Sequence, residues 1–220
     1  MDVTKAIKER MTTRGFKPGP VPPELLRKII EQALRAPSWA NTQPWQFAVV
    51  TGQPLEEIKK GFVEREADER TPDIARPYDF PEPYISRIRN LSATDRTTEQ
   101  DKDYRRRQNY KNHDAPVVIY LLIDRAFYYQ SKGINAWSLY DCASAVQNIM
   151  LLATNYGLST VAQASAVVFP DIIRKAVPIP DSKLIALGIA IGYADWDNPV
   201  NQSRSQRVPL DEVTTWYGFD

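Results

Sequence analysis

Apolar residues recur at helical spacing in two segments near the start of the chain. Within residues 3–11 three apolar residues stand four apart, which predicts a short helix over residues 4–10 before the Pro- and Gly-rich turn TTRGFKPGPVPP. The stretch PPELLRKIIEQALRA (residues 22–36) opens with proline and repeats Leu and Ile at intervals of three and four. It predicts an amphipathic helix that ends before Pro37.

Three β-rich runs predict strands: WQFAVVTG (45–52), APVVIYLLID (115–124) and KLIALGIAIGYAD (183–195). The last two are continuously apolar rather than alternating, so we expect both of their faces to be covered. Between them AWSLYDCASAVQNIMLLATNYG (136–157) is apolar around its circumference and stops at Gly157, a favoured C-terminal cap. It predicts a buried helix. Strands that alternate with helices indicate α+β or α/β layers about a central sheet.

Two further segments differ in composition from this body. Residues 61–113 are rich in charge and proline but carry aromatic side chains, which favours an insertion folded over the body, with two short helices, over plain disorder. Residues 196–220 are polar and end in Trp-Tyr-Gly-Phe-Asp. We expect such a tail to dock on another surface. The chain has 220 residues, which favours one domain with these two additions.

The charge balance argues against nucleic-acid and membrane partners. Lys and Arg number 28 against 27 Asp and Glu, giving a net charge of +1, so a small-molecule partner is favoured. Cys142 is the lone cysteine and His113 the lone histidine, so neither a disulfide nor a His-based metal site is expected. The charged N-terminal segment lacks a signal peptide's apolar core, and no run reaches the roughly 18 apolar residues of a membrane span. We therefore expect a cytoplasmic protein without a metal.

Clustered arginines are the first candidate chemistry. Arg10 and Arg14 flank two threonines, and Arg204 and Arg207 lie beside serines. Arginine next to hydroxyl donors can hold a phosphate without a Gly-rich loop. The alternative is that all four are solvated surface charges.

The stretch APSWANTQPW (residues 36–45) is the second candidate. It combines the polar side chains of Ser38, Asn41 and Gln43 with two tryptophans. This combination suits a flat heteroaromatic ring with imide edges. The alternative is a rigid helix-to-strand turn in which the amide side chains satisfy the backbone.

Taken together, RMTTRGF, APSWANTQPWQF, NYGLSTVAQAS and RVPLDEV resemble the nitroreductase family of FMN-dependent oxidoreductases, in the same order over nearly the whole chain. The insertion and the ADWDNPVNQ segment are most similar to the branch that contains nitrobenzoate reductases. The resemblance implies an α+β fold with a central sheet flanked by helices. It also implies an intertwined homodimer with two FMN molecules at its interface, each chain being one FMN-binding domain whose C-terminal extension reaches onto the partner subunit.

The family's binding positions fall on fourteen residues of this chain. The resemblance places the phosphate and ribityl contacts on Arg10, Met11, Thr12, Arg14, Arg204 and Arg207. It places the loop that contacts the flavin ring on Pro37, Ser38, Trp39, Asn41 and Gln43. Ser38 is expected to come from the partner subunit. The backbone amides near flavin N5 and O4 are placed on Gln163, Ala164 and Ser165. Two positions depart from the family pattern: Met11 replaces a basic or polar residue, and AQAS replaces a segment that more often contains glycine.

The implied activity is hydride transfer from NADH or NADPH through FMN to a nitroaromatic or quinone-type acceptor, without a catalytic side chain. The chain has no dinucleotide fingerprint and no room for a separate nicotinamide domain, so donor and acceptor are expected to share one cavity, which predicts ping-pong kinetics. The acceptor pocket is placed at Trp39, Tyr78, Phe80 and Tyr84, with packing of the insertion as the alternative. A structural or surface role is favoured for His113 over proton donation. Other readings are an FMN reductase for dehalogenation or enone reduction, and a flavin-binding dimer without turnover.

Overall fold

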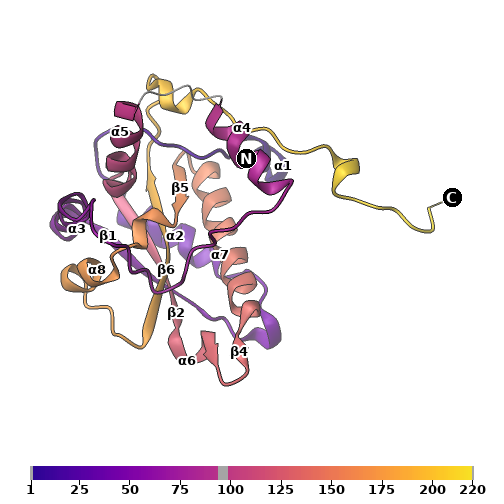
Figure 1. Cartoon of the computed structure of the whole chain (residues 1–220), viewed down its shortest axis with the longest axis horizontal. Helices are drawn as coiled ribbons and strands as arrows, with labels where there is room; N and C mark the ends of the chain where they lie inside the picture. Colours follow the sequence, from indigo (N-terminus) through magenta and orange to yellow (C-terminus); the bar gives the residue numbers. More distant parts are fainter. Residues whose placement is uncertain (1, 94–98, 220) are drawn as a thin grey trace.

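The computed structural model describes residues 2–93 and 99–219. Side chains are described for residues 2–90 and 103–219. A central antiparallel sheet has the strand order β1-β2-β6-β5 (Figure 1). Its strands are β1 (Trp45–Thr51), β2 (Val117–Asp124), β5 (Ser159–Gln163) and β6 (Lys183–Gly192). A small hairpin pairs β3 (Tyr129–Gln130) with β4 (Gly133–Ile134).

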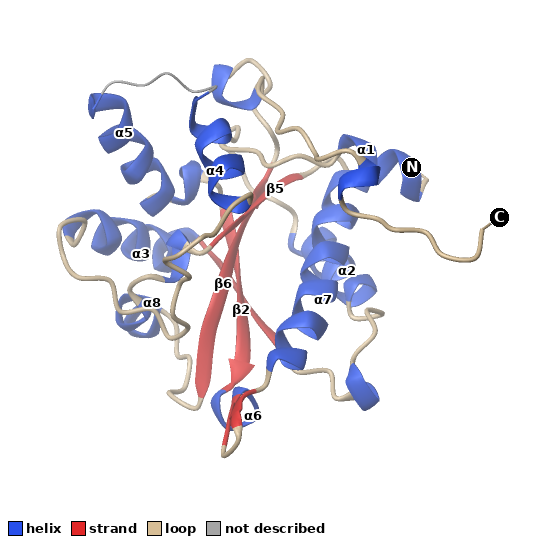
Figure 2. Cartoon of the chain, turned by 45° about the vertical axis from the view of Figure 1, so that its right-hand side comes forward, coloured by secondary structure: helices blue, strands red, loops and turns tan. Residues whose placement is uncertain are grey.

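Eight α-helices surround this sheet in the described part of the chain. They are α1 (Val3–Glu9), α2 (Pro23–Ala33), α3 (Gly52–Glu64), α4 (Tyr84–Ala93), α5 (Glu99–Tyr110), α6 (Arg125–Tyr128), α7 (Ala136–Asn155) and α8 (Pro170–Ala176). α2 and α7 lie on one side of the sheet, and α3, α5 and α8 on the other (Figure 2). The predicted α+β fold with a helix-flanked central sheet is therefore confirmed. None of the helices described is long and apolar enough to cross a membrane.

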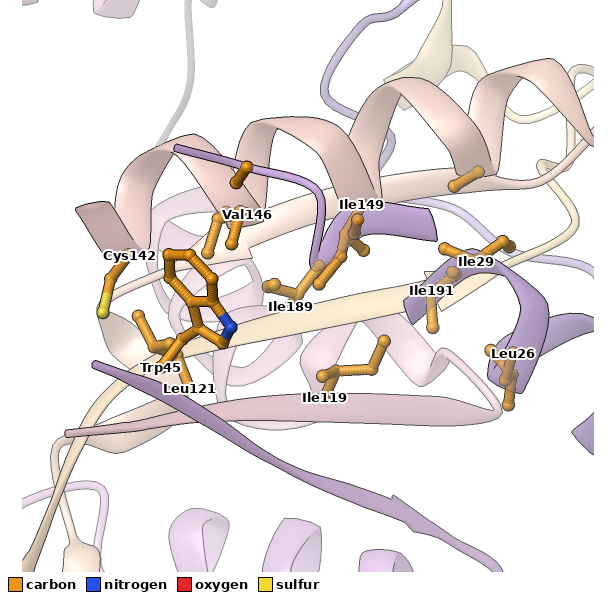
Figure 3. Packing of buried hydrophobic residues seen from close by; sticks show 14 of the residues in the cluster. Leu26, Ile29, Trp45, Ile119, Leu121, Cys142, Val146, Ile149, Ile189 and Ile191 are labelled. Carbon is orange, nitrogen blue, oxygen red and sulfur yellow. The ribbon is translucent and has the colours of Figure 1, made fainter. Parts of the chain in front are cut away.

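The sheet is apolar on both faces, as its continuous sequence pattern predicted. Along β2, Ile119 and Leu121 point toward α2 and α7, whereas Val118 and Tyr120 point toward α3 and α8. Figure 3 shows the first face, where β2 and β6 side chains pack against Val146 and other residues of α7. Burying both sets of alternating positions removes apolar surface from water on two sides, which stabilises the strands at the centre.

Two predicted helices agree with the structure in type and differ at their ends. α1 covers residues 3–9 rather than 4–10. α2 stops at Ala33, before the predicted end, because tight turns from Gln32 to Arg35 and from Ala33 to Ala36 lead into Pro37. α7 ends as predicted: Gly157 has φ +79° and its amide donates to Thr154, closing the helix.

Among the elements that were not predicted are β5, α3 and α8, each for a local reason. β5 has five residues and follows Gly157 almost directly, so its pattern is too short to recognise. α3 begins at Gly52 with no connecting loop after β1. Gly and Pro at its start interrupt the helical spacing of its apolar residues. α8 has seven residues and opens with Pro170. Tertiary contacts, rather than local propensity, therefore define these elements.

The two segments of unusual composition also have local structure. Residues 61–113 contain α4 and α5, the two short helices expected there. The tail beyond β6 contains two single-turn helices, Pro199–Asn201 and Leu210–Glu212, and its last part runs away from the body (Figure 1). Trp216, Tyr217 and Phe219 are all more than half exposed on the single chain.

Candidate ligand-binding site

Three of the predicted arginines come together at the end of α1. A guanidinium nitrogen of Arg204 donates to the carbonyl oxygens of Lys8 and Arg10. The pKa of Arg10 lies below its ordinary value because the side chain is partly buried and because Arg207 and Arg204 place like charges beside it. Within the described residues, none of the three guanidinium groups forms an ion pair with a carboxylate. The cluster is therefore a local surplus of positive charge.

Asn201, which the sequence did not single out, fastens the start of the tail to the chain after α1. Its side-chain amide donates to the carbonyl oxygens of Gly15 and Asp195 at 2.8 Å each, and its oxygen accepts from the Arg14 amide at 2.8 Å. The residue is only 3% exposed. These bonds hold two segments about 190 residues apart in sequence at fixed separation, so Arg204 and Arg207 are presented next to Arg10.

Gln163, Ala164 and Ser165 follow the same edge of the sheet. Thr12 pairs in parallel with Thr160 of β5, and the Thr13 amide donates to the Thr160 carbonyl at 3.1 Å. β5 ends at Gln163, and a single turn, Ser165–Val167, starts two residues later. The turn lies close against β6, since a Cβ on Gly188 would come within 2.5 Å of the Ala166 Cβ. Backbone pairing thus places Thr160 of β5 beside Thr12, and β5 leads from there to the Gln163–Ser165 segment.

Buried polar groups accumulate behind this edge. The Gln163 side chain is 4% exposed and donates to the Asn109 carbonyl at 3.5 Å, while its oxygen has no hydrogen-bond partner among the described residues. His113 is 6% exposed, and burial together with the charge of Arg14 lowers its pKa to about 4. His113 is therefore neutral at neutral pH and packed inside the protein, not on its surface. Residues Asn112, His113 and Asp114 have φ between 51° and 58°, a strained left-handed turn.

The loop after α2 is held by its own side chains. The Gln43 amide donates to Ser38 Oγ at 3.0 Å, and the Gln43 side-chain nitrogen donates to the Asn41 carbonyl and side-chain oxygens at 3.4 and 3.2 Å. Ala40, Asn41 and Gln43 have positive φ. The single chain therefore has the loop-internal bonding that the turn interpretation of this stretch predicts. The side chains of Asn41 and Gln43 are nevertheless exposed, so they remain accessible to a ligand.

Asp141 of α7 fixes this loop to the body. Its carboxylate accepts from the Trp39 amide at 3.1 Å, although the sequence offered no signal for this contact across about 100 residues. Asp141 is buried while the Trp39 ring is 63% exposed. The loop therefore has an anchored backbone and an open aromatic surface.

The loop and the arginine cluster lie toward opposite ends of α7. Asp141 is in the first third of this 20-residue helix, which is about 30 Å long. α1, which leads into the cluster, instead lies beside its last turns, where the two helices line a groove that contains Ala6 and Asn155. Within the described residues no hydrogen bond or ion pair joins loop 37–43 to the three arginines or to Gln163–Ser165. One chain therefore brings the predicted residues into two separate groups.

The three aromatic residues predicted for the acceptor pocket lie on the segment that leads into α4. Tyr78 is 85% exposed, Tyr84 53% and Phe80 39%. The Arg87 guanidinium stacks over the Tyr84 ring, 5.5 Å from its centre. These residues are not packed into the body of the single chain, which weakens the alternative that they serve only to anchor the insertion.

The fold and the two residue groups define an α+β protein with a positively charged cluster at one end of its central helix and an amide-and-aromatic loop at the other. Comparison with known sequences gives the family: the Nitroreductase family matches residues 7–193, and the chain belongs to it. The predicted resemblance is therefore confirmed.

Individual relatives match over nearly the full length. The chloronitrobenzene nitroreductase of Comamonas testosteroni is 34% identical, covering 96% of this chain and 94% of its own. The 4-nitrobenzoate reductase of Pseudomonas putida is 30% identical over 100% and 97% of the two chains. Among solved structures, the FMN- and NADPH-dependent nitroreductase NfnB of Sphigopyxis sp. strain HMH has a TM-score of 0.90 and 30% identity, with complete coverage of both chains.

Proposed function

We propose that this chain is an NAD(P)H-dependent FMN oxidoreductase that reduces nitroaromatic or quinone-type acceptors. The observation that carries the proposal is the convergence of Arg10, Arg204 and Arg207, three positive charges from both ends of the chain without carboxylate partners among the described residues. Such a cluster suits a dianionic phosphate monoester. Membership of the family supports the same interpretation. So does the similarity to NfnB, which is described as an FMN- and NADPH-dependent nitroreductase.

The residues present fit FMN. The arginine cluster and Thr12 would hold its phosphate, the backbone of Gln163–Ser165 would face one edge of the ring, and loop 37–43 would meet the ring from another side. The unpaired Gln163 oxygen behind that edge is a further polar group that a bound ligand could orient. When bound, FMN supplies hydride transfer at its N5 atom.

A homodimer would unite the two groups. A two-fold axis beside α7 would bring the loop of one chain to the arginine end of its partner, which one chain cannot do over about 30 Å of helix. Apolar side chains are exposed along the same surface: Val3 and Ile7 of α1, and Trp137 and Tyr140 of α7. A groove of about 360 Å³ between α1, α2 and α7 also lies there. We infer that a second copy covers this surface.

The tail extends this inference. Its last residues run away from the body and leave three aromatic rings exposed, as expected for an arm that embraces a partner subunit (Figures 1 and 2). In this reading residues 1–220 form one FMN-binding domain, residues 61–113 are its variable insertion, and residues 196–220 are the arm. The buried, unpaired Cys142 is consistent with a cytoplasmic location.

The protein's own part in the reaction is to bind and orient. Neutral amides of the loop and the Gln163–Ser165 backbone offer hydrogen bonds without adding charge beside the ring. Trp39, Tyr78, Phe80 and Tyr84 would form the walls against which an aromatic acceptor stacks. No side chain is required as a proton donor, and a buried, neutral His113 is not placed to be one. Donor and acceptor would occupy one cavity in turn, which is ping-pong kinetics.

The test is spectroscopic. Purified protein should be yellow, and anaerobic addition of NADPH or NADH should bleach its flavin absorption bands. Re-oxidation by a nitroaromatic compound or a quinone should restore them, and double-reciprocal plots at several donor concentrations should be parallel. A colourless protein that takes up no added FMN would refute the proposal, and a flavin that stays oxidised with both donors would favour a binding protein without turnover.

A further inference from the structure

Four arginines line a second cavity that the proposed chemistry has not used. The cavity has a volume of about 390 Å³ and lies between the segment after α3, the second half of α5 and the turn that begins at Ser165. Its arginines are Arg70, Arg76, Arg105 and Arg106.

The lining contains no acidic side chain. The other residues around the cavity are Asn109, Tyr110, Ser165 and Val168, all neutral. Arg70 donates to the Tyr110 hydroxyl at 3.2 Å, and Arg106 donates to Asp103 on the outside of α5 at 2.8 Å. Arg76 forms no hydrogen bond or ion pair with any residue that the structure describes. Arg70 and Arg76 have no carboxylate partner among the described residues, so an oxyanion in the cavity could be held by two positive charges that no acid neutralises.

The cavity adjoins the proposed FMN site through one shared residue, Ser165. Ser165 lines it, and the same residue begins the turn after β5 whose backbone is proposed to face the flavin ring. Asn109 also lines it, and the Asn109 carbonyl accepts from the Gln163 side chain. A ligand whose anionic group lies in this cavity could therefore reach toward the ring past Ser165.

We propose that these arginines form an oxyanion site that selects for a charged group on the compound that reacts with the flavin. The inference rests on the proposed function and specifies the ligand class of that same site. Two redox ligands carry a suitable group: a nicotinamide donor with a 2′-phosphate, and an aromatic acceptor with a carboxylate. Phosphate and carboxylate can each accept two parallel hydrogen bonds from the planar guanidinium group of an arginine.

The test uses the holoenzyme and the double substitution R70Q/R76Q, which removes two charges and keeps long polar side chains. Arg27→Gln is the single-charge control, because Arg27 is exposed on α2, far from the cavity in sequence and structure. Anaerobic stopped-flow reduction by NADPH and by NADH gives the dissociation constant of each donor. Re-oxidation by 4-nitrobenzoate and by nitrobenzene gives the corresponding values for the acceptors.

The substitution should weaken the charged member of one pair by about tenfold or more and change its uncharged counterpart by less than about twofold. Loss for NADPH but not NADH assigns the cavity to the donor phosphate. Loss for 4-nitrobenzoate but not nitrobenzene assigns it to the acceptor carboxylate. Equal effects within both pairs, or none, overturn the proposal.

A binding measurement keeps this result separate from the proposed function. Calorimetric titration of the oxidised protein with adenosine 2′,5′-bisphosphate and with benzoate requires no turnover. The wild type and Arg27→Gln should bind one of these probes, and R70Q/R76Q should lose about tenfold in affinity for it. If the wild type is reduced normally but binds neither probe, the oxyanion site is refuted while the FMN oxidoreductase stands. If the protein holds no FMN, the proposed function itself has failed.

Discussion

Arg207 lies on the surface of the single chain, and its hydrogen bonds to described residues all stay within its own loop, to Ser205 and Gln206. Arg207→Ala should therefore leave the fold intact and weaken FMN binding. Losing one charge-assisted contact costs about 1.5–3 kcal/mol, a roughly 10- to 150-fold rise in Kd. Fluorescence titration of the apoprotein with FMN measures it, with the exposed Arg27→Ala as control. An unchanged Kd would remove Arg207 from the phosphate site.

His113 should make stability depend on pH. Its pKa is about 4 in the folded chain against an ordinary value of 6.5, so the unfolded state binds one more proton between these values. The free energy of unfolding should thus fall by about 2–3 kcal/mol as the pH drops from about 7 to about 4.5. His113→Asn tolerates the local positive φ and should lose this part of the pH dependence. Urea unfolding at the two pH values measures this change. An equal loss of unfolding free energy in the wild type and in His113→Asn would contradict the prediction.

At this scale the sequence revealed residue types well and partners poorly. The arginines and the amides of residues 36–45 were recognisable because charge and side-chain chemistry are local properties. Asn201 and Asp141 escaped notice because a single buried amide or carboxylate has no pattern, and its partners lie about 190 and 100 residues away. The four arginines of the second cavity were missed because they come from two segments, residues 70–76 and 105–106, that only the fold brings together.

Among the elements, α7 has the largest structural role, because it separates the two residue groups and anchors the loop through Asp141. Asp141→Ala removes the acceptor of the Trp39 amide and leaves that amide unpaired, at a cost of about 1–3 kcal/mol. We expect weaker FMN binding by about tenfold with the same secondary structure. FMN titration and circular dichroism check this. Asp197→Ala removes an exposed carboxylate as the control, and equal behaviour of the two variants would show that the anchor does not matter.

Elements with a clear period were predictable, whereas short elements, and α3 with its Gly and Pro start, were not. The buried strands and α7 contain enough apolar residues for their patterns to be recognised. Gly157 marks the end of α7, where the backbone has a positive φ. β5 and α8 are five and seven residues long and depend on the sheet and on α3 for their stability. The site depends on β5, so this omission mattered: without it, nothing in the pattern placed Thr12 beside Thr160.

For the whole molecule, the central claim is that two copies of the chain complete each FMN site. The exposed apolar surface of α1 and α7, the groove between them and the projecting tail all argue for a partner. Sequence periodicity alone could not reveal this arrangement, because it reports which face is apolar and not what covers it. The resemblance to a family supplied the expectation, and the separation along α7 supplies a physical reason for it.

The most direct measurement is the FMN content of a mixed dimer. One chain carries R10A/R207A, and the other carries N41G/Q43G, in which glycine keeps the positive φ of the loop without strain. Each variant alone should bind FMN weakly. Co-expressed with two affinity tags and purified as the mixed species, they should regain about one FMN per dimer, since one of the two sites then combines an intact arginine cluster with an intact loop. A mixed dimer that holds no more FMN than either parent would show that each site belongs to a single chain, and would contradict the account.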